Sequence, residues 1–219
     1  MNIGVIFDAD GVLFDSEKLE QITFPEAFVE YGITLDHEDV MHSMGVSNRD
    51  YMPYIKKKYG KDIDWRDFNR RKIALHKAIV EERGLEVFDG IRDLIEALRM
   101  KHIPFAVASS SDPERVRFNL ETTGLAHYFS VIITSYDVTR SKPDPEIFLI
   151  AAESISRKPE ECAVLEDSIP GVQAANNAGM KCIALTNTFP RKELVDADLV
   201  LNSARDISVE TLEQLIDSR

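Results

Sequence analysis

Cysteine is scarce in this chain of 219 residues, which contains only two, Cys162 and Cys182. Each lies within a short apolar run that we interpret as a buried strand, so we predict two free thiols in the core. A disulfide between them is the alternative, but so low a count is typical of proteins in a reducing compartment.

Basic residues are also in short supply. The 26 lysines and arginines face 38 aspartates and glutamates, which gives a net charge of -12. This charge repels nucleic acid, anionic membranes and phosphate esters alike, so we expect no nucleic-acid partner. An anionic substrate would need local help from a bound cation, a lysine or arginine, or the backbone N–H groups at a helix start.

Long apolar runs are absent too. The chain reaches the acidic Asp8 after a short apolar run and begins with no basic leader. We therefore expect neither a signal peptide nor a membrane span, and we expect a monomer in the cytoplasm. The sequence also contains no internal repeat, no low-complexity tract and no linker rich in proline and glycine.

What is present fits a globular α/β protein. With 44% hydrophobic and 29% charged residues, the chain can bury a sizeable core as one larger domain or two small ones. From Ile103 onward, short apolar runs alternate with helical patterns, which indicates β-α-β units. The predicted strands cover Ile3 to Phe7, Phe105 to Ser109, Val131 to Thr134, Ala163 to Leu165 and Ile183 to Leu185. This alternation predicts an α/β fold with a doubly wound, Rossmann-like parallel sheet.

Residues 15–86 interrupt the alternation with polar, helix-rich patterns and no β-branched strand run. We predict an inserted all-helical domain at 15–86 and an α/β core domain made of residues 1–14 and 87–219. Because the insert follows the first strand, its two connections lie near that strand's carboxyl end, where open α/β folds bind ligands. The insert can therefore act as a lid.

Two carboxylates, Asp8 and Asp10, stand where the first predicted strand emerges into a loop before Gly11. Mutual repulsion and desolvation make this placement costly unless a cation, a proton or strong hydrogen bonds compensate. A shared Mg²⁺ is the simplest compensation, because the possible ligands are oxygen atoms and the five histidines are scattered. The alternative is that both side chains merely shape a turn.

Hydroxyl groups follow the second predicted strand. Ser109, Ser110 and Ser111 lie between that strand and a helix that begins at Pro113. Serine hydroxyls and exposed N–H groups at a helix start can hold a phosphate group. Ser111 or Asp112 also has the ordinary interpretation of a helix cap.

A lysine and a second acid pair lie at two further helix starts. Lys142 stands before a proline at the beginning of a helix, where positive charge is unfavourable, so a phosphate or the Asp8 carboxylate should face it. Taken alone, a solvated surface lysine remains the simpler interpretation. Glu166 and Asp167 end the fourth predicted strand and can complete a metal site, or Asp167 or Ser168 can cap the following helix.

The four segments together favour one function. An acid pair, a hydroxyl-lined loop, a lysine and a second acid pair all fall at strand ends or helix starts of an alternating α/β chain. The sequence therefore predicts a metal site that handles phosphate, with a small phosphorylated metabolite as the partner.

In this order, the four segments resemble the motifs of the haloacid dehalogenase-like superfamily, whose first motif has the form D-x-D-G-[TV]. The resemblance spans Asp8 to Asp167, and the insert after Asp10 matches the position of that family's helical cap. The runs FDADGVLFDS, SKPDPE and EDSIPG are similar to the phosphatase and β-phosphoglucomutase branch.

The resemblance implies a role for each residue. Asp8 would be the nucleophile that forms an aspartyl-phosphate, and Asp10 would be the general acid and base. Ser109 and Lys142 would bind the transferring phosphoryl group, and the Ser110 region would contribute backbone donors. The ligands implied for Mg²⁺ are the Asp8 side chain, the Asp10 backbone carbonyl and Asp167, with Glu166 in support.

The helical cap decides the substrate. The segment Gly45 to Arg49 resembles the cap segment from which β-phosphoglucomutases present an arginine to a second phosphate, so Arg49 is a candidate for gripping a distal anion. A surface arginine paired with Asp50 is the alternative. The histidine that mutases carry early in the first cap helix is expected around Glu20 and is absent here.

Four functions compete on these residues. We expect an Mg-dependent phosphohydrolase that cleaves a small phosphate monoester, such as a sugar phosphate, under a closing cap. A β-phosphoglucomutase-type mutase is the alternative. A dehalogenase needs no acid at the position of Asp10, and a silent binding protein would have little reason to keep every catalytic residue type.

Overall fold

The computed structural model describes residues 2–43 and 46–218. Gly45, the first residue of the segment that resembles the mutase cap segment, lies outside this range.

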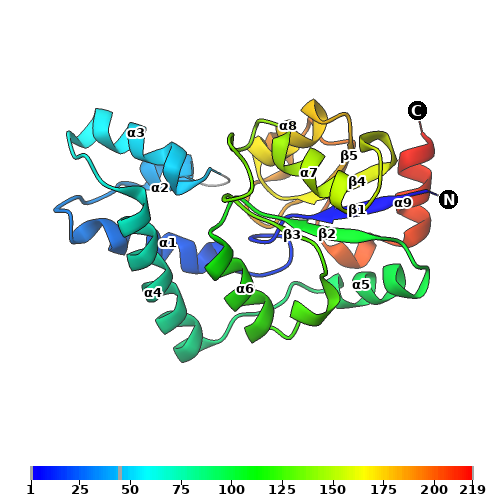
Figure 1. The fold of residues 1–219 in the computed structure, drawn as a ribbon, viewed down its shortest axis with the longest axis horizontal. Helices are drawn as coiled ribbons and strands as arrows, with labels where there is room; N and C mark the ends of the chain where they lie inside the picture. The colour runs from blue at the N-terminus through cyan, green and yellow to red at the C-terminus, as the bar shows by residue number, and fades with distance from the viewer. Residues whose placement is uncertain (1, 44–45, 219) are drawn as a thin grey trace.

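A parallel sheet forms the centre of the larger part of the molecule (Figure 1). Its strands are β1 (Gly4–Phe7), β2 (Phe105–Ala108), β3 (Ile132–Ile133), β4 (Cys162–Glu166), β5 (Lys181–Leu185) and β6 (Leu199–Leu201). The order is β3-β2-β1-β4-β5-β6, and every neighbouring pair is parallel. This arrangement confirms the predicted doubly wound α/β fold.

The strand β6 was not predicted. It is only three residues long, lies at the edge of the sheet and is partly exposed along its whole length. A run of that length carries no alternation of apolar and polar residues, so a pattern-based interpretation passes over it. The sheet therefore has one strand more than the sequence indicated.

Helices cover both faces of the sheet (Figure 1). Successive side chains of β1 pack against different helices, because successive residues of a strand point to opposite faces of the sheet. Val5 and Phe7 pack with α5 (Ile91–Met100), α6 (Pro113–Thr122) and α9 (Val209–Asp217). Ile6 packs with α7 (Glu146–Ser154) and α8 (Ile169–Asn177) on the other face.

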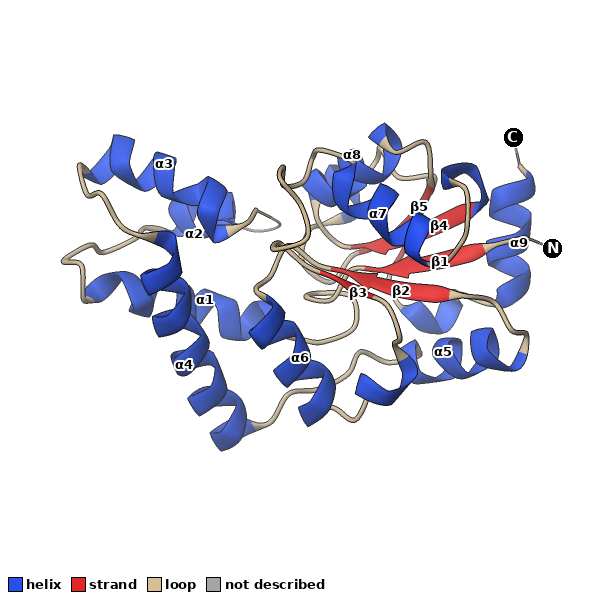
Figure 2. Ribbon diagram, viewed as in Figure 1, coloured by secondary structure: helices blue, strands red, loops and turns tan. Residues whose placement is uncertain are grey.

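Four further helices follow β1 and lie together at one end of the molecule, away from the two termini (Figure 2). They are α1 (Glu17–Val29), α2 (His37–Ser43), α3 (Asn48–Tyr59) and α4 (Trp65–Arg83), and we call them the helical unit. They have an aromatic core of their own, in which Phe24, Phe28, Tyr51 and Phe68 are buried against one another. No strand occurs between β1 and α5 among the described residues.

The order of the strands places a crevice beside β1. The chain leaves β1 toward β2 on one side, while β4 pairs with β1 on the other, and ligands of open α/β sheets bind at such a switch point beyond the carboxyl ends of the strands. Asp8 directly follows β1, and Glu166 is the last residue of β4.

Two other features bear on the sequence predictions. Cys162 and Cys182 are buried free cysteines, as predicted. In the described part of the chain, no helix is both long and apolar enough to cross a membrane.

Candidate active site

Asp8 is buried at the carboxyl end of the central strand, with 7% of its surface exposed. Its backbone N–H donates to the Leu165 carbonyl at 2.9 Å, which extends the pairing of β1 with β4 and fixes where the side chain emerges. Burial, together with the charge of the neighbouring Glu166, raises the pKa of Asp8 to about 7, although the Lys142 ammonium group acts to lower it. A cation beside this carboxylate would lower the pKa and favour the charged, nucleophilic form.

Lys142 bridges two carboxylates. Its Nζ atom donates to Asp8 Oδ1 at 2.5 Å and to Glu166 Oε1 at 2.6 Å, and the residue is only 4% exposed. Burial alone would lower the pKa of Lys142, but the charges of Asp8 and Glu166 outweigh it and hold the pKa above its ordinary value. Lys142 is therefore a buried cation in contact with the nucleophile candidate, and the interpretation as a surface lysine is wrong.

Glu166 uses both of its oxygens inside the protein. Oε1 accepts from Lys142, while Oε2 accepts from the backbone N–H groups of Asp167 and Ser168 at 2.8 Å each. Gly171 leaves the room that this carboxylate needs, since a Cβ atom there would stand 1.8 Å from Glu166 Oε1. Glu166 thus orients Lys142 and the start of α8.

Asp167 lies beside Gly11, close to the loop that carries Asp10. A Cβ atom at Gly11 would stand 1.8 Å from Asp167 Oδ2, and Gly11 has a φ of +77°, which residues with side chains rarely adopt. The Thr188 hydroxyl donates to the same Oδ2 atom. Asp167 is 3% exposed and lines the same pocket as Asp8.

Both oxygens of Asp10 accept hydrogen bonds from the chain. Oδ1 accepts from Ser16 at 2.6 Å and from Arg115 Nη2 at 2.8 Å, and Oδ2 accepts from Ser111 at 2.6 Å. Burial would raise the pKa of Asp10, but the Arg115 guanidinium and the serine hydroxyls outweigh it and hold the pKa below its ordinary value. Ser16 is the N-cap residue of α1, yet its hydroxyl serves Asp10 and makes no cap hydrogen bond.

The serine loop after β2 faces the same pocket. Ser109 is buried and its Oγ atom accepts from the Ser111 N–H at 3.1 Å, which folds the loop over. Asp112 caps α6 by accepting from the Glu114 N–H at 2.9 Å, and Pro113 begins that helix. The capping interpretation is therefore correct for Asp112 and leaves Ser109 and Ser110 to the pocket.

One pocket gathers most of the predicted site residues and is lined from both sides. Asp8, Asp10, Ser109, Ser110 and Asp167 line it from the sheet. The helical unit contributes Glu20, Ser43, Val46, Asn48, Asn69, Lys72 and Ile73. Lys142 and Glu166 stand behind this lining, where Lys142 contacts Asp8.

Arg49 lies in a neighbouring pocket that it shares with Ser110 and Asp112. Its guanidinium donates to the Val138 and Thr139 carbonyls at 3.4 and 3.1 Å, and it pairs with Asp50 at 3.4 Å. Arg49 therefore joins α3 to the loop before Lys142, at the edge of the predicted site.

Three charged residues of the site were not predicted from the sequence: Arg115 on α6, Glu20 on α1 and Lys72 on α4. They are 3%, 9% and 6% exposed, and they form ion pairs with Asp10 or with one another. Charged residues are rarely so buried unless they are paired. No local motif marks them, because the partners are brought together only when the helical unit packs on the sheet.

The donor set fits Mg²⁺. Asp8 and Asp167 present carboxylates to one pocket, and Mg²⁺ is commonly held by one or two carboxylates while it keeps several waters. Within residues 2–43 and 46–218, no three His, Cys, Asp or Glu side chains form a metal-binding group. A site with two carboxylates and a backbone carbonyl, as the family resemblance implies, needs no such group.

Comparisons with known proteins identify related sequences and structures. Residues 5–185 match a family model described as haloacid dehalogenase-like hydrolase. The chloroplastic protein SUPPRESSOR OF QUENCHING 1 of Arabidopsis thaliana is 35% identical over 197 residues, which are 88% of this chain and 19% of that protein. The chain thus spans about a fifth of that relative's length.

Two further matches cover most of both chains. A phosphorylated carbohydrates phosphatase of Thermotoga maritima is 32% identical over 179 residues, or 82% of each chain. The crystal structure of a mutant of CbbY from Rhodobacter sphaeroides, in complex with xylulose-(1,5)bisphosphate, superposes with a TM-score of 0.87. It is 25% identical and covers 97% of this chain and 99% of that one.

Proposed function

The chain belongs to the haloacid dehalogenase-like hydrolase family, and on that premise we propose that it is an Mg²⁺-dependent phosphatase that cleaves small phosphate monoesters with Asp8 as the nucleophile. The observation that carries the proposal is the environment of Asp8. This carboxylate is buried at the end of β1, contacts Lys142 at 2.5 Å and shares a pocket with Asp10, Ser109 and Asp167.

The first step transfers the phosphoryl group to Asp8. A carboxylate oxygen of Asp8 attacks phosphorus, and the bond from phosphorus to the ester oxygen breaks. The departing oxygen takes a proton from Asp10, whose carboxyl group would be protonated once the negative charge of the bound phosphate offsets the Arg115 guanidinium and raises its pKa. The products of this step are the free alcohol, an aspartyl-phosphate and an ionised Asp10.

The second step releases phosphate. Water attacks the phosphorus of the aspartyl-phosphate, and the Asp10 carboxylate takes a proton from that water. The bond from phosphorus to Asp8 then breaks, so inorganic phosphate leaves while Asp8 is again a carboxylate and Asp10 is again protonated. Asp10 thus alternates between acid and base, and its place beside Asp8 in the pocket suits both steps.

Positive groups compensate the charge of the transferring phosphoryl group. The Lys142 ammonium group, which contacts Asp8, and donors of the Ser109–Ser110 loop, which lines the pocket, would stabilise the negative charge on that group. The Asp8 and Asp167 side chains and the Asp10 carbonyl would hold Mg²⁺, and Glu166 would support them by fixing Lys142. Bound Mg²⁺ would neutralise charge between Asp8 and the phosphoryl oxygens.

The helical unit is proposed to act as the cap, with its domain at 15–86 and the catalytic domain at 1–14 and 87–219. Its residues line the leaving-group side of the pocket with hydroxyl, amide and charged groups, among them Ser43, Asn48 and Asn69. Such a lining suits the hydroxyl groups of a sugar. The relatives named for phosphorylated carbohydrates and bound to xylulose-(1,5)bisphosphate support a sugar phosphate as substrate.

Arg49 is proposed to contact the distal part of a substrate from the neighbouring pocket. It lies at the rim and already bonds to backbone carbonyls of the catalytic domain. We also propose that the protein works as a monomer in a reducing compartment such as the cytoplasm, which suits its two buried free cysteines.

The proposal is tested with a panel of phosphorylated sugars and p-nitrophenyl phosphate. Wild-type protein should hydrolyse members of the panel with added Mg²⁺ and should lose that activity when a chelator removes the metal. Asp8→Asn should abolish hydrolysis while leaving the circular dichroism spectrum and melting temperature near those of the wild type. Near-normal turnover by Asp8→Asn, or full activity without a divalent metal, would contradict the mechanism.

A further inference from the structure

We propose that Arg115 is a positioning residue, which holds the Asp10 carboxyl group in line for proton transfer and ties its position to the helical unit through Glu20. The proposal rests on the function proposed above, because it assumes that Asp10 exchanges protons with the leaving group and with water. Neither Arg115 nor Glu20 belongs to the four segments that carry the chemistry.

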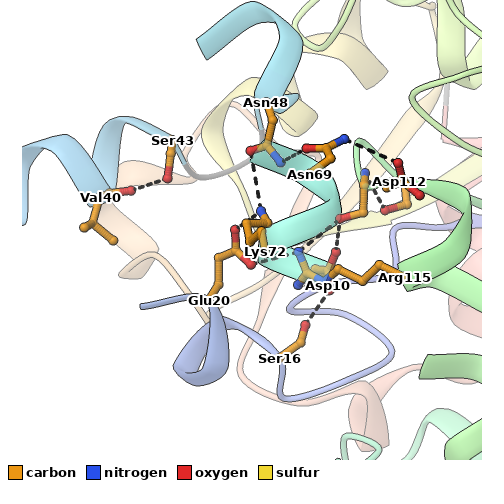
Figure 3. Close-up of polar contacts among 12 residues, drawn as sticks. Asp10, Ser16, Glu20, Val40, Ser43, Asn48, Asn69, Lys72, Asp112 and Arg115 are labelled. Carbon is orange, nitrogen blue, oxygen red and sulfur yellow. Dashed lines mark hydrogen bonds and ion pairs between the residues drawn. The ribbon is translucent and has the colours of Figure 1, made fainter. Parts of the chain in front are cut away.

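The guanidinium group of Arg115 lies between two carboxylates (Figure 3). Nη2 donates to Asp10 Oδ1 at 2.8 Å, and Nη1 forms an ion pair with Glu20 Oε2 at 2.8 Å. The Arg115 side chain is 4% exposed, against 14% for Asp10 and 12% for Glu20. A planar guanidinium with a fixed fork of donors can set the distance and angle between two such partners.

Glu20 carries the contact into the helical unit. It accepts from the Lys72 ammonium group on α4, which also reaches Asn48 Oδ1 at 3.5 Å (Figure 3). Asn48 donates to Asn69 Oδ1 at 2.5 Å.

The chain of contacts then returns to the sheet domain. Asn69 donates to Asp112 Oδ2 at 3.3 Å, and Asp112 caps the helix α6 that carries Arg115. The contacts therefore form a closed circuit across the two parts of the molecule. A shift of the helical unit relative to α6 would act on Arg115 and thus on Asp10.

A contribution to stability does not by itself explain why these charged residues are buried together. Buried ion pairs seldom stabilise a protein more than apolar residues of the same shape, since the cost of desolvation offsets their attraction. Proton transfer, in contrast, needs the acid within about 2.6–3.2 Å of the reacting oxygen. A misplacement of about 1 Å can cost on the order of a hundredfold in rate. The diversion of the Ser16 hydroxyl from its cap position to Asp10 points the same way.

The test uses two substrates that differ in their need for an acid. An alkyl phosphate, such as glucose 6-phosphate, expels a poor leaving group, whereas p-nitrophenyl phosphate expels a stable phenolate. Comparing kcat/KM isolates the steps up to the first phosphoryl transfer. Arg115→Gln should lower kcat/KM for the alkyl phosphate by about a hundredfold, within the range of general acid catalysis, and by less than about tenfold for the nitrophenyl ester.

Two controls separate this role from a general loss of structure. Arg117→Gln removes an exposed arginine of the same helix and should leave both rates unchanged. In Arg115→Ala, added guanidinium ion at millimolar concentration should restore part of the alkyl phosphate rate, which a structural defect would not allow.

Glu20→Gln covers the case in which the Arg115 variants fail to fold. It keeps Arg115 and Asp10 but weakens the link to α1, so the rate with the alkyl phosphate should fall about tenfold more than the rate with the nitrophenyl ester. Equal losses on both substrates in every folded variant would overturn the positioning role while the wild type still hydrolyses both. If the wild type hydrolysed neither substrate with Mg²⁺, the proposed function itself would fail.

Discussion

Replacing Lys142 with methionine should destabilise the protein far more than removing an ordinary lysine. The substitution keeps much of the side-chain volume but leaves two carboxylates, Asp8 and Glu166, buried without their cation at 7% and 0% exposure. Removing one partner of a buried ion pair typically costs about 3–5 kcal/mol, because a buried charge is left uncompensated. That is a large share of a stability of about 5–15 kcal/mol.

Lys181→Met is the matched control. Lys181 pairs with Asp198 at 2.8 Å, but both side chains are partly exposed, at 24% and 27%, so its loss should cost at most about 1 kcal/mol. Urea unfolding at pH 7 measures both values.

The deficit of Lys142→Met should also depend on pH. Without the Lys142 charge, which lowers the pKa of Asp8, that pKa should rise further above its unfolded value, so the variant should lose more stability than the wild type as the pH rises. The gap to the wild type should therefore narrow on acidification. A deficit at pH 7 no larger than that of Lys181→Met would refute the account of Lys142 as the compensating charge.

Two further predictions concern the metal site and the buried His76 on α4. Gly11→Ala places a Cβ atom 1.8 Å from Asp167 Oδ2, so the apparent Mg²⁺ affinity measured from activity should fall about tenfold or more. The control is Gly179→Ala, which should leave the affinity unchanged because Gly179 has a similar φ of +72° but open space around it. Equal affinities in the two variants would contradict the assignment of Asp167. His76 is fully buried, and burial together with the nearby Arg115 charge lowers its pKa from 6.5 to about 4. Because the unfolded chain takes up this proton more readily, up to about 3 kcal/mol of stability should be lost as the pH falls from 6.5 to about 4. Thermal melts of His76→Gln should show a weaker pH dependence over that range, and an unchanged dependence would rule out His76 as its source.

Much of the fold could be predicted from the sequence because its elements are locally coded. The apolar run before Asp8 and the alternation after Ile103 identify five of the strands, while Pro113 and Pro170 mark where α6 and α8 begin. The strand β6 was missed because three partly exposed edge residues carry too little pattern.

The site was predictable to the extent that its residues sit next to strand ends. Asp8, Asp10, Ser109 and Asp167 each follow a buried run, and parallel strands bring such positions to one edge. For Lys142, the local sequence favoured a surface lysine, since only the folded structure shows that it is buried between Asp8 and Glu166. Its two partners lie 134 and 24 residues away in the sequence, and the folded sheet brings them to one edge.

The network around Arg115 lay beyond the reach of the sequence. Its partners come from the first loop, α1 and α4, at separations of up to 105 residues. On a helical pattern, Arg115, Glu20 and Lys72 look like ordinary surface charges. Their burial follows from how the helical unit packs, which no local motif encodes.

The central claim is that Asp8 carries the phosphoryl group. It is tested most directly by trapping the intermediate in Asp10→Asn, which should slow the attack of water on the aspartyl-phosphate. After this variant is mixed with Mg²⁺ and p-nitrophenyl phosphate and quenched in acid, mass spectrometry should find one phosphoryl group on the peptide that contains Asp8. The double variant with Asp8→Asn should carry none. Turnover of the substrate by the wild type, with no phosphoryl group on that peptide or with the group on another residue, would contradict the account.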